Sequence, residues 1–280
     1  ASDYIQLTKD YSAPNYAPLD VVITKGEGCW VWDVEGNKYL DFLSAYSAVN
    51  FGHCNERIRK VAEDQLKKLT LTSRSFYTDE LALLTKEISD FLGYEMSLFM
   101  NSGAEAVETA IKTARRWGYT TKKIEENKAE IIVFDKNFHG RTTTIISFSD
   151  SVEGRRAFGP YTEGFVMCKY GDIESVKKAV NKNTVAILVE PIQGEGGINI
   201  PPAGFLKSLK SLCEAEKLLF IADEIQTGLC RTGRVLCCDH DNVKPDLVVL
   251  GKSLGGGIIP ISVVLGNKDT LSLLLPGSHG

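Results

Sequence analysis

Hydrophobic positions change their spacing near Met96, and this change predicts two kinds of structure. Before it, residues 55–70 and 79–92 carry apolar side chains three and four positions apart, which is typical of amphipathic helices. After it, short continuous apolar runs alternate with helical segments. This alternation favours an α/β fold of three layers, in which a mostly parallel sheet has helices on both faces.

The elements expected after Met96 follow from the length and spacing of these runs. The predicted strands are Ser97–Met100, Glu130–Phe134, Thr144–Phe148, Val185–Val189, Leu218–Ala222, Leu247–Leu250 and Ile261–Leu265. The predicted helices are 103–118, 173–181 and 203–216.

The first 52 residues are expected to form a separate segment. Residues 1–25 contain two prolines and mixed polarity, which predicts an arm or loop. Residues 29–41 contain two β-prone runs around a Glu-Gly-Asn turn, which predicts a hairpin. We therefore expect an arm and hairpin over 1–52, as part of a small domain, and a large domain over 53–280.

Composition narrows the classes of function. The chain has 280 residues, of which 43% are hydrophobic and 24% charged, as in ordinary folded proteins. A net charge of −4 gives no electrostatic reason to expect binding to nucleic acid or to a membrane surface. No apolar run approaches the roughly 18 residues of a membrane span. The seven cysteines lack the spacing of a metal site or a disulfide framework, so we expect free thiols and no metal.

Polar residues directly follow five of the predicted strands. The carboxyl ends of parallel strands meet at one edge of a sheet, and ligands bind there. After the first strand, Ser102, Gly103 and Ala104 open a helix, so their backbone N–H groups could hold an anion. Taken alone, such a turn is more often a simple helix cap.

The second and third strand ends also carry groups that suit a ligand. Phe138 and His139 could stack on a flat ring, and Arg141 could hold a carboxylate. A surface loop is the simpler interpretation of that motif by itself. Glu190 and Glu195 follow the next strand among three glycines, which favours a ligand and an ordinary loop about equally.

The fourth and fifth strands end in an acid and in a lysine. Asp223 follows five apolar residues, and a buried carboxylate needs a partner. The pKa of a lysine in the position of Lys252 is easily lowered, and a neutral amine can form a Schiff base. The alternative is a structural ion pair between Lys252 and either Asp223 or Glu224.

One cofactor would use all five features. It needs an anion cradle for a phosphate, an aromatic side chain beside its ring, an acid that keeps a ring nitrogen protonated, and a lysine for its aldehyde. That cofactor is pyridoxal 5'-phosphate. Its protonated ring is an electron acceptor for a carbanion on the substrate.

These motifs, in this order, resemble the fold-type I pyridoxal-phosphate enzymes, and specifically the class III aminotransferases. The resemblance rests on Asn101–Ala106, Phe138–Arg141, Asp223–Gly228 and Gly251-Lys252. It covers the chain from about residue 14 to the end.

The N-terminal part points further within this class. Asn15–Pro18 and Phe42–Cys54 closely resemble ornithine δ-aminotransferases. That resemblance implies ping-pong transfer of the δ-amino group of L-ornithine to 2-oxoglutarate through a Schiff base on Lys252. The products would be glutamate and glutamate 5-semialdehyde, which cyclises to pyrroline-5-carboxylate.

The resemblance also implies a role for each matching residue. Lys252 and Asp223 would be catalytic, Gln226 would contact the phenolic oxygen of the ring, and Glu195 would mask a C-terminal arginine. The implied cofactor-binding residues are Ser102, Gly103, Ala104, Phe138, His139, Glu190, Asp223, Gln226 and Lys252. The implied substrate-binding residues are Tyr16, Tyr46, Arg141 and Glu195.

Several alternatives remain open. Acetylornithine and 4-aminobutyrate aminotransferases share the cofactor chemistry, although Tyr16 and Tyr46 together favour ornithine. A decarboxylase, an aminomutase or a non-catalytic binding protein could use the same scaffold. A dinucleotide-dependent dehydrogenase fits poorly, because no G-x-G-x-x-G motif follows an early strand.

Assembly and extent are further expectations from the resemblance. A homodimer is implied, with the active site at the subunit interface. The expected location is the cytoplasm, and the alternative is the mitochondrial matrix after removal of a transit peptide. The family is expected to continue beyond Gly280 with a C-terminal small domain. We therefore expect activity from the longer chain and none from these 280 residues alone.

Overall fold

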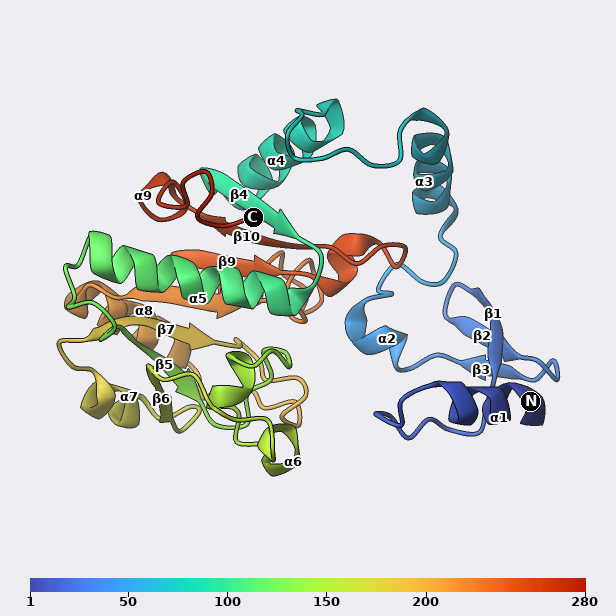
Figure 1. Cartoon of the computed structure of the whole chain (residues 1–280), viewed down its shortest axis with the longest axis horizontal. Coiled ribbons are helices and arrows are strands. Elements are labelled where there is room, and N and C mark those ends of the chain that lie inside the picture. Colours follow the sequence, from blue (N-terminus) through green and yellow to red (C-terminus); the bar gives the residue numbers. More distant parts are fainter.

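The computed structural model describes all 280 residues of the chain. Its centre is a seven-stranded sheet in the order β4-β10-β9-β8-β7-β5-β6 (Figure 1). The strand β10 is antiparallel to both of its neighbours, and the other pairs are parallel, which confirms the predicted mostly parallel sheet. The strands are β4 (Met96–Met100), β5 (Glu130–Phe134), β6 (Phe165–Cys168), β7 (Thr184–Val189), β8 (Leu219–Asp223), β9 (Leu247–Leu250) and β10 (Ser262–Gly266).

Helices cover both faces of this sheet, because alternate residues of a strand point to opposite sides. In β5, Ile131 belongs to the apolar core that includes α5 (Gly103–Thr120), whereas Ile132 belongs to a second core on the other face. The second core includes residues of α7 (Ile173–Ala179) and α8 (Phe205–Glu216) (Figure 1). The three-layer α/β fold expected from the sequence is therefore confirmed.

One predicted strand is wrong. The run 144–148 is the short 3-10 helix η1 (Ile145–Phe148). Thr142 begins this turn, because its carbonyl accepts the N–H of Ile146 at 2.9 Å and its hydroxyl accepts the N–H of Ile145 at 3.2 Å. The edge of the sheet beside β5 is occupied by β6 instead. A buried apolar run of this length fits a strand or a helical turn equally well, so periodicity cannot distinguish them.

The N-terminal segment is more ordered than the sequence suggests. The arm predicted over 1–25 contains the helix α1 (Ser2–Tyr11) and the start of β1 (Ile23–Glu27). None of the residues of α1 is buried, so it has no core-facing apolar stripe that would reveal it. The strand β1 pairs with β2 (Trp30–Asp33), which forms the predicted hairpin with β3 (Lys38–Leu40).

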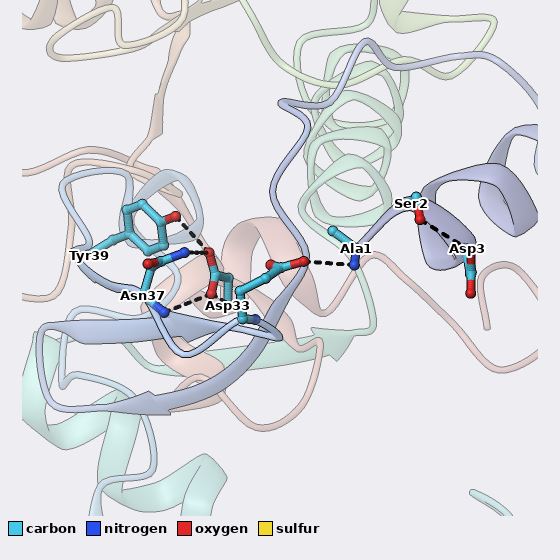
Figure 2. A network of polar contacts seen from close by, with 7 residues as sticks. Ala1, Ser2, Asp3, Asp33, Asn37 and Tyr39 are labelled. Carbon is cyan, nitrogen blue, oxygen red and sulfur yellow. Dashed lines mark hydrogen bonds and ion pairs between the residues drawn. The ribbon is translucent and has the colours of Figure 1, made fainter.

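Asp33 organises the turn of this hairpin (Figure 2). Its carboxylate accepts hydrogen bonds from the Tyr39 hydroxyl at 2.7 Å and from the side-chain amide of Asn37 at 2.9 Å. It also accepts the backbone N–H groups of Glu35 at 3.0 Å and of Asn37 at 2.8 Å. One buried side chain therefore fixes the turn between β2 and β3.

The three helices between β3 and β4 in the chain connect these two sheets. Helices α3 (Glu56–Lys68) and α4 (Asp79–Leu92) lie close to their predicted ranges, and a division of the chain at residue 52 stays a prediction. None of the helices has both the length and the hydropathy that a membrane span requires. The short elements are α2 (Ser44–Ser47), α6 (Val152–Arg155), η2 (Cys237–Asp241), η3 (Lys252–Gly255) and α9 (Lys268–Leu271).

Candidate active site

The five polar strand ends meet around one cavity of about 220 Å³ at the carboxyl edge of the sheet. Every residue predicted to bind the cofactor lines it, with the exception of Ser102. The lining residues are Gly103, Ala104, Phe138, His139, Gly140, Glu190, Ile192, Glu195, Asp223, Ile225, Gln226, Thr227 and Lys252.

Lys252 follows β9 and carries a free amine into this cavity. It forms no ion pair or side-chain hydrogen bond, so the alternative of a structural pair with Asp223 or Glu224 is wrong. Burial lowers the pKa of Lys252, against the opposing negative charges of Asp223, Glu195 and Glu190. Its backbone φ of +45° is in the left-handed region, a conformation that concentrates at functional sites. A desolvated, unpaired amine is a nucleophile.

Glu224 has a different task from its neighbour Asp223. Its buried carboxylate accepts the N–H groups of Cys237 at 2.8 Å and Cys238 at 2.9 Å, and the hydroxyl of Thr227 at 2.7 Å. These bonds tie the end of β8 to η2, so Glu224 is satisfied outside the cavity.

Asp223 and His139 form a buried pair at the base of the cavity. Nδ1 of His139 lies 2.7 Å from Oδ2 of Asp223, and the side chains are 1% and 4% exposed. Burial of the imidazole opposes its charge, but the hydrogen bond to Asp223 and the charges of Asp223 and Glu190 outweigh it and raise the pKa of His139. The other Asp223 oxygen accepts the N–H of Ile225 at 3.1 Å. His139 therefore fixes the position of the Asp223 carboxylate at the cavity, where the cofactor requires an acid for its pyridinium nitrogen.

The first turn of α5 offers free donors to an anion. Gly103 and Ala104 are its first two residues, and N–H groups in this position have no acceptor within a helix. Ser102 is the N-cap, and its hydroxyl accepts the N–H of Glu105 at 3.3 Å. The Glu105 carboxylate in turn accepts the N–H of Ser102 at 2.7 Å. The cap therefore holds the turn in place, and the hydroxyl of Ser102 lies outside the cavity lining.

Glu190 connects the third strand end to the aromatic residue at the cavity. Its carboxylate accepts the N–H of Phe138 at 3.0 Å. Burial raises the pKa of Glu190 to about 7, with Asp223 adding to the shift and His139 opposing it. Phe138 is held beside the cavity through its backbone, which leaves its ring free to stack on a ligand.

This shifted pKa gives a pH dependence of stability. The folded-state pKa of about 7 exceeds the ordinary value of 4.5, so the folded protein holds this proton more tightly than the unfolded chain. Glu190 should therefore contribute stability below pH 4.5 that disappears as the pH rises to about 7, on the order of 3 kcal/mol. We expect Glu190→Gln to gain stability relative to the wild type over this range, in urea unfolding measured at several pH values. The exposed Glu126→Gln is the control, and a pH-independent difference for Glu190→Gln would contradict the assignment.

Gln226 depends on a glycine across the cavity. A Cβ on Gly194 would lie 1.4 Å from Oε1 of Gln226, so only glycine leaves the amide in place. Nε2 of Gln226 donates to Glu195 at 3.4 Å and to the carbonyl of Tyr46 at 3.3 Å. The amide thus lies between the third strand end and the N-terminal segment.

Neither predicted tyrosine lines this cavity: Tyr46 lies beside it, and Tyr16 lines a separate cavity within the N-terminal segment. Tyr46 contacts Gln226 through its carbonyl, and the hydrogen bond that its hydroxyl donates to Tyr16 raises the pKa of Tyr46, with a smaller contribution from the charge of Glu195. Arg141 lines a neighbouring cavity of about 480 Å³ and lies over the ring of Phe138, 5.6 Å from its centroid. The two cavities share Phe138, Gly140 and Glu195, so Glu195 faces both.

Sequence reasoning missed three apolar or hydroxyl residues of the lining, namely Ile192, Ile225 and Thr227. Ile225 and Thr227 belong to the segment after β8 that carries Asp223, so their position in that motif was the available signal. Ile225 also packs close to the phosphate cradle, since a Cβ on Gly103 would lie 2.8 Å from its Cδ1.

These residues fit pyridoxal phosphate. The cradle has two unused N–H donors, the buried acid Asp223 is hydrogen-bonded to His139, and the amine of Lys252 is unpaired. The combination defines a fold-type I enzyme that uses this cofactor.

The chain belongs to the class-III aminotransferases, because the model of that family matches residues 11–280. It is 56% identical over 278 residues to an ornithine aminotransferase of Bacillus cereus. The aligned region is 99% of this chain and 70% of that protein. The chain is 55% identical over 276 residues to ornithine aminotransferase 2 of Staphylococcus aureus, again with 99% and 70% covered.

Solved structures agree with this placement. An ornithine aminotransferase from Toxoplasma gondii matches with a TM-score of 0.99 and 45% identity, over 100% of this chain and 66% of that chain. An acetylornithine aminotransferase from Elizabethkingia anophelis matches with a TM-score of 0.88, also at 45% identity, over 100% and 67%. The chain thus spans about two thirds of the length of these structures.

Proposed function

We propose that the protein transfers the δ-amino group of L-ornithine to 2-oxoglutarate, giving glutamate 5-semialdehyde and glutamate. The observation that carries this proposal is the pair of tyrosines, Tyr16 and Tyr46, next to Gln226 and Glu195, two residues of the cavity that contains the unpaired amine of Lys252. The names of the relatives at 55% and 56% identity support the same substrate.

When bound, pyridoxal phosphate supplies an aldehyde that takes up the amino group and a pyridinium ring that draws electrons from the substrate carbon. Lys252 Nζ, with its lowered pKa, would take the proton from the substrate carbon beside the reacting nitrogen and would deliver it to the carbon that receives the amino group. Asp223 would hold the ring nitrogen, and His139 orients the Asp223 carboxylate. Gly103 and Ala104 would hold the phosphate through their N–H groups.

Two different substrates must use this site in turn. Arg141 lines the second cavity and is suited to the γ-carboxylate of 2-oxoglutarate, because a guanidinium binds a carboxylate in a bidentate manner. The hydroxyls of Tyr16 and Tyr46 are suited to the amino-acid end of ornithine. Glu195, which faces both cavities, is placed to discriminate between a substrate with a second carboxylate and one without.

Single-turnover reactions of the intact enzyme with ornithine, N-acetylornithine and 4-aminobutyrate test this proposal. We expect ornithine to convert the cofactor most efficiently, and Tyr46→Phe to reduce the reaction with ornithine more than the reaction with 2-oxoglutarate. A preference for N-acetylornithine would contradict the proposal and would instead indicate an acetylornithine aminotransferase.

We also infer a homodimer with the active site at its interface. Large apolar side chains are fully or mostly exposed in the N-terminal third of the chain, among them Tyr11, Leu19, Phe42, Leu71 and Tyr77. Exposed apolar surface on this scale is typical of an interaction surface. Sedimentation of the intact enzyme should give twice the mass of one chain, and a monomer that retains full activity would contradict the inference.

A further inference from the structure

The segment that carries Tyr46 has a strained backbone. All four residues of α2, Ser44, Ala45, Tyr46 and Ser47, have positive φ, at 50°, 46°, 56° and 75°. L-amino acids adopt this left-handed conformation singly and rarely in runs, because Cβ approaches the following carbonyl. Such a turn persists only where its surroundings hold it in place.

Asp41 supplies the contacts that hold this turn. One carboxylate oxygen accepts the N–H of Leu43 at 2.9 Å and the N–H of Ser44 at 2.8 Å, at the point where the left-handed residues begin. The other oxygen lies 2.7 Å from Nε2 of His53. Both side chains are largely buried, with Asp41 16% and His53 27% exposed. His53 therefore fixes the orientation of the carboxylate that caps the turn.

His53 is itself fixed by the three-stranded sheet. Its backbone exchanges two hydrogen bonds with Gly28, of 3.0 and 2.7 Å, which place it beside the end of β1. Its ring packs on Gly26, where a Cβ would lie only 2.7 Å from Cγ of His53. The absence of a side chain at Gly26 thus makes room for the imidazole.

The turn delivers Tyr46 to the active site. The carbonyl of Tyr46 accepts a hydrogen bond from Nε2 of Gln226, and the hydroxyl of Tyr46 is within hydrogen-bonding reach of Tyr16. The helix α2 also packs against η3, the turn that begins at Lys252. In Figure 1, α2 lies between the three-stranded sheet and the large sheet. A path of direct contacts therefore runs from β1 through His53 and Asp41 to a substrate residue.

We propose that Asp41 and His53 are positioning residues that hold the left-handed turn and so set Tyr46 against Tyr16 and Gln226 for the amino-acid end of the diamino substrate. The inference rests on the proposed function, because it assigns these tyrosines to ornithine. It predicts that loosening the turn weakens the ornithine half-reaction and spares the 2-oxoglutarate half-reaction, which uses Arg141 at the other cavity.

The two half-reactions of the intact, cofactor-loaded enzyme measure this separation. We expect His53→Ala to lower kcat/KM for ornithine roughly 10- to 100-fold, mainly through KM, because a displaced binding group costs about this much. The 2-oxoglutarate half-reaction should stay within about threefold of the wild type. Gly26→Ala should have the same effect in kind, because it displaces the His53 ring and removes no polar group.

Conservative and matched variants separate positioning from general loosening. Asp41→Asn keeps an oxygen for the two N–H groups and should retain most of the activity with ornithine, whereas Asp41→Ala should behave like His53→Ala. Asp33→Asn is the control, since Asp33 organises the hairpin turn of the same sheet (Figure 2) and does not touch α2. Amide hydrogen exchange at residues 43 and 44 reports whether the turn has opened.

Each outcome decides the proposal. A selective loss with ornithine in His53→Ala and Gly26→Ala, with faster exchange at residues 43 and 44, supports it. Faster exchange with an unchanged KM for ornithine, or equal losses in both half-reactions, overturns it. If His53→Ala does not fold, Gly26→Ala and the comparison of Asp41→Ala with Asp41→Asn give the decision. A wild-type enzyme that does not react with ornithine would instead overturn the proposed function.

Discussion

We expect replacement of Lys252 by alanine to abolish transamination with both proposed substrates and to prevent covalent attachment of pyridoxal phosphate. The amine of Lys252 is the unpaired nitrogen of the cavity, and no other lysine lines it. Burial, which lowers its pKa, makes it both a nucleophile toward an aldehyde and a base toward carbon. Loss of its acid–base role alone should cost roughly 10⁴-fold in rate, and loss of the covalent link should add to this.

Attachment of the cofactor to Lys252 is measured by the absorbance spectrum of the cofactor-loaded enzyme and by its mass after borohydride reduction. The wild type should gain the mass of the reduced cofactor at the peptide that contains Lys252, and Lys252→Ala should gain none. The exposed Lys182→Ala is the matched control and should react normally. Turnover by Lys252→Ala at more than a small fraction of the wild-type rate would remove Lys252 from its assigned role.

Asp223→Asn should cause the second large loss. Asparagine keeps the shape of the side chain but removes the charge that holds a proton on the ring nitrogen, so we expect kcat/KM to fall roughly 10²- to 10⁴-fold for both substrates. The same change should lower the pKa of His139. Its raised value depends on Asp223, and burial alone acts in the opposite direction.

An NMR titration of the His139 imidazole checks this coupling independently of turnover. Asp223→Asn should shift the titration of this ring to lower pH, and His139→Asn should leave the acid in place with a smaller loss of rate. If the imidazole titrates unchanged in Asp223→Asn, the pairing at 2.7 Å does not set its charge. Equal rates for Asp223→Asn and the wild type would show that the carboxylate is not needed.

Much of the site could be predicted because its residues lie at the ends of buried strands. The strands β8 and β9 are adjacent and parallel, so Asp223 at the end of one and Lys252 after the other had to face the same edge. The same rule places Glu190 after β7 and Phe138 after β5 at that edge. Apolar runs of four to six residues identify such strands. They are not sufficient for every element, because the run at η1 was predicted as a strand and the strand β6 was not predicted.

Pairing within the site could not be predicted in the same way. The sequence was compatible with an ion pair between Lys252 and Asp223. In the structure the carboxylate of Asp223 pairs with His139, and the amine of Lys252 has no partner. The sequence also allowed Ser102 as a phosphate ligand, whereas its hydroxyl caps α5 and lies outside the cavity lining. These choices depend on differences of a few tenths of an ångström in the distances between groups that are far apart in the chain.

Most of the strands and helices of the large sheet followed from the sequence alone, as did the chemistry at each strand end and therefore the cofactor. Alternation of apolar residues and the identity of a few polar ones are local properties, and a parallel sheet converts them into one shared edge. The folded structure was needed to show which acid meets which base, that Glu195 faces two cavities, and that Asp41 and His53 contact a left-handed turn that contains Tyr46. Those features arise from contacts between residues distant in sequence, for which no single segment carries a signal.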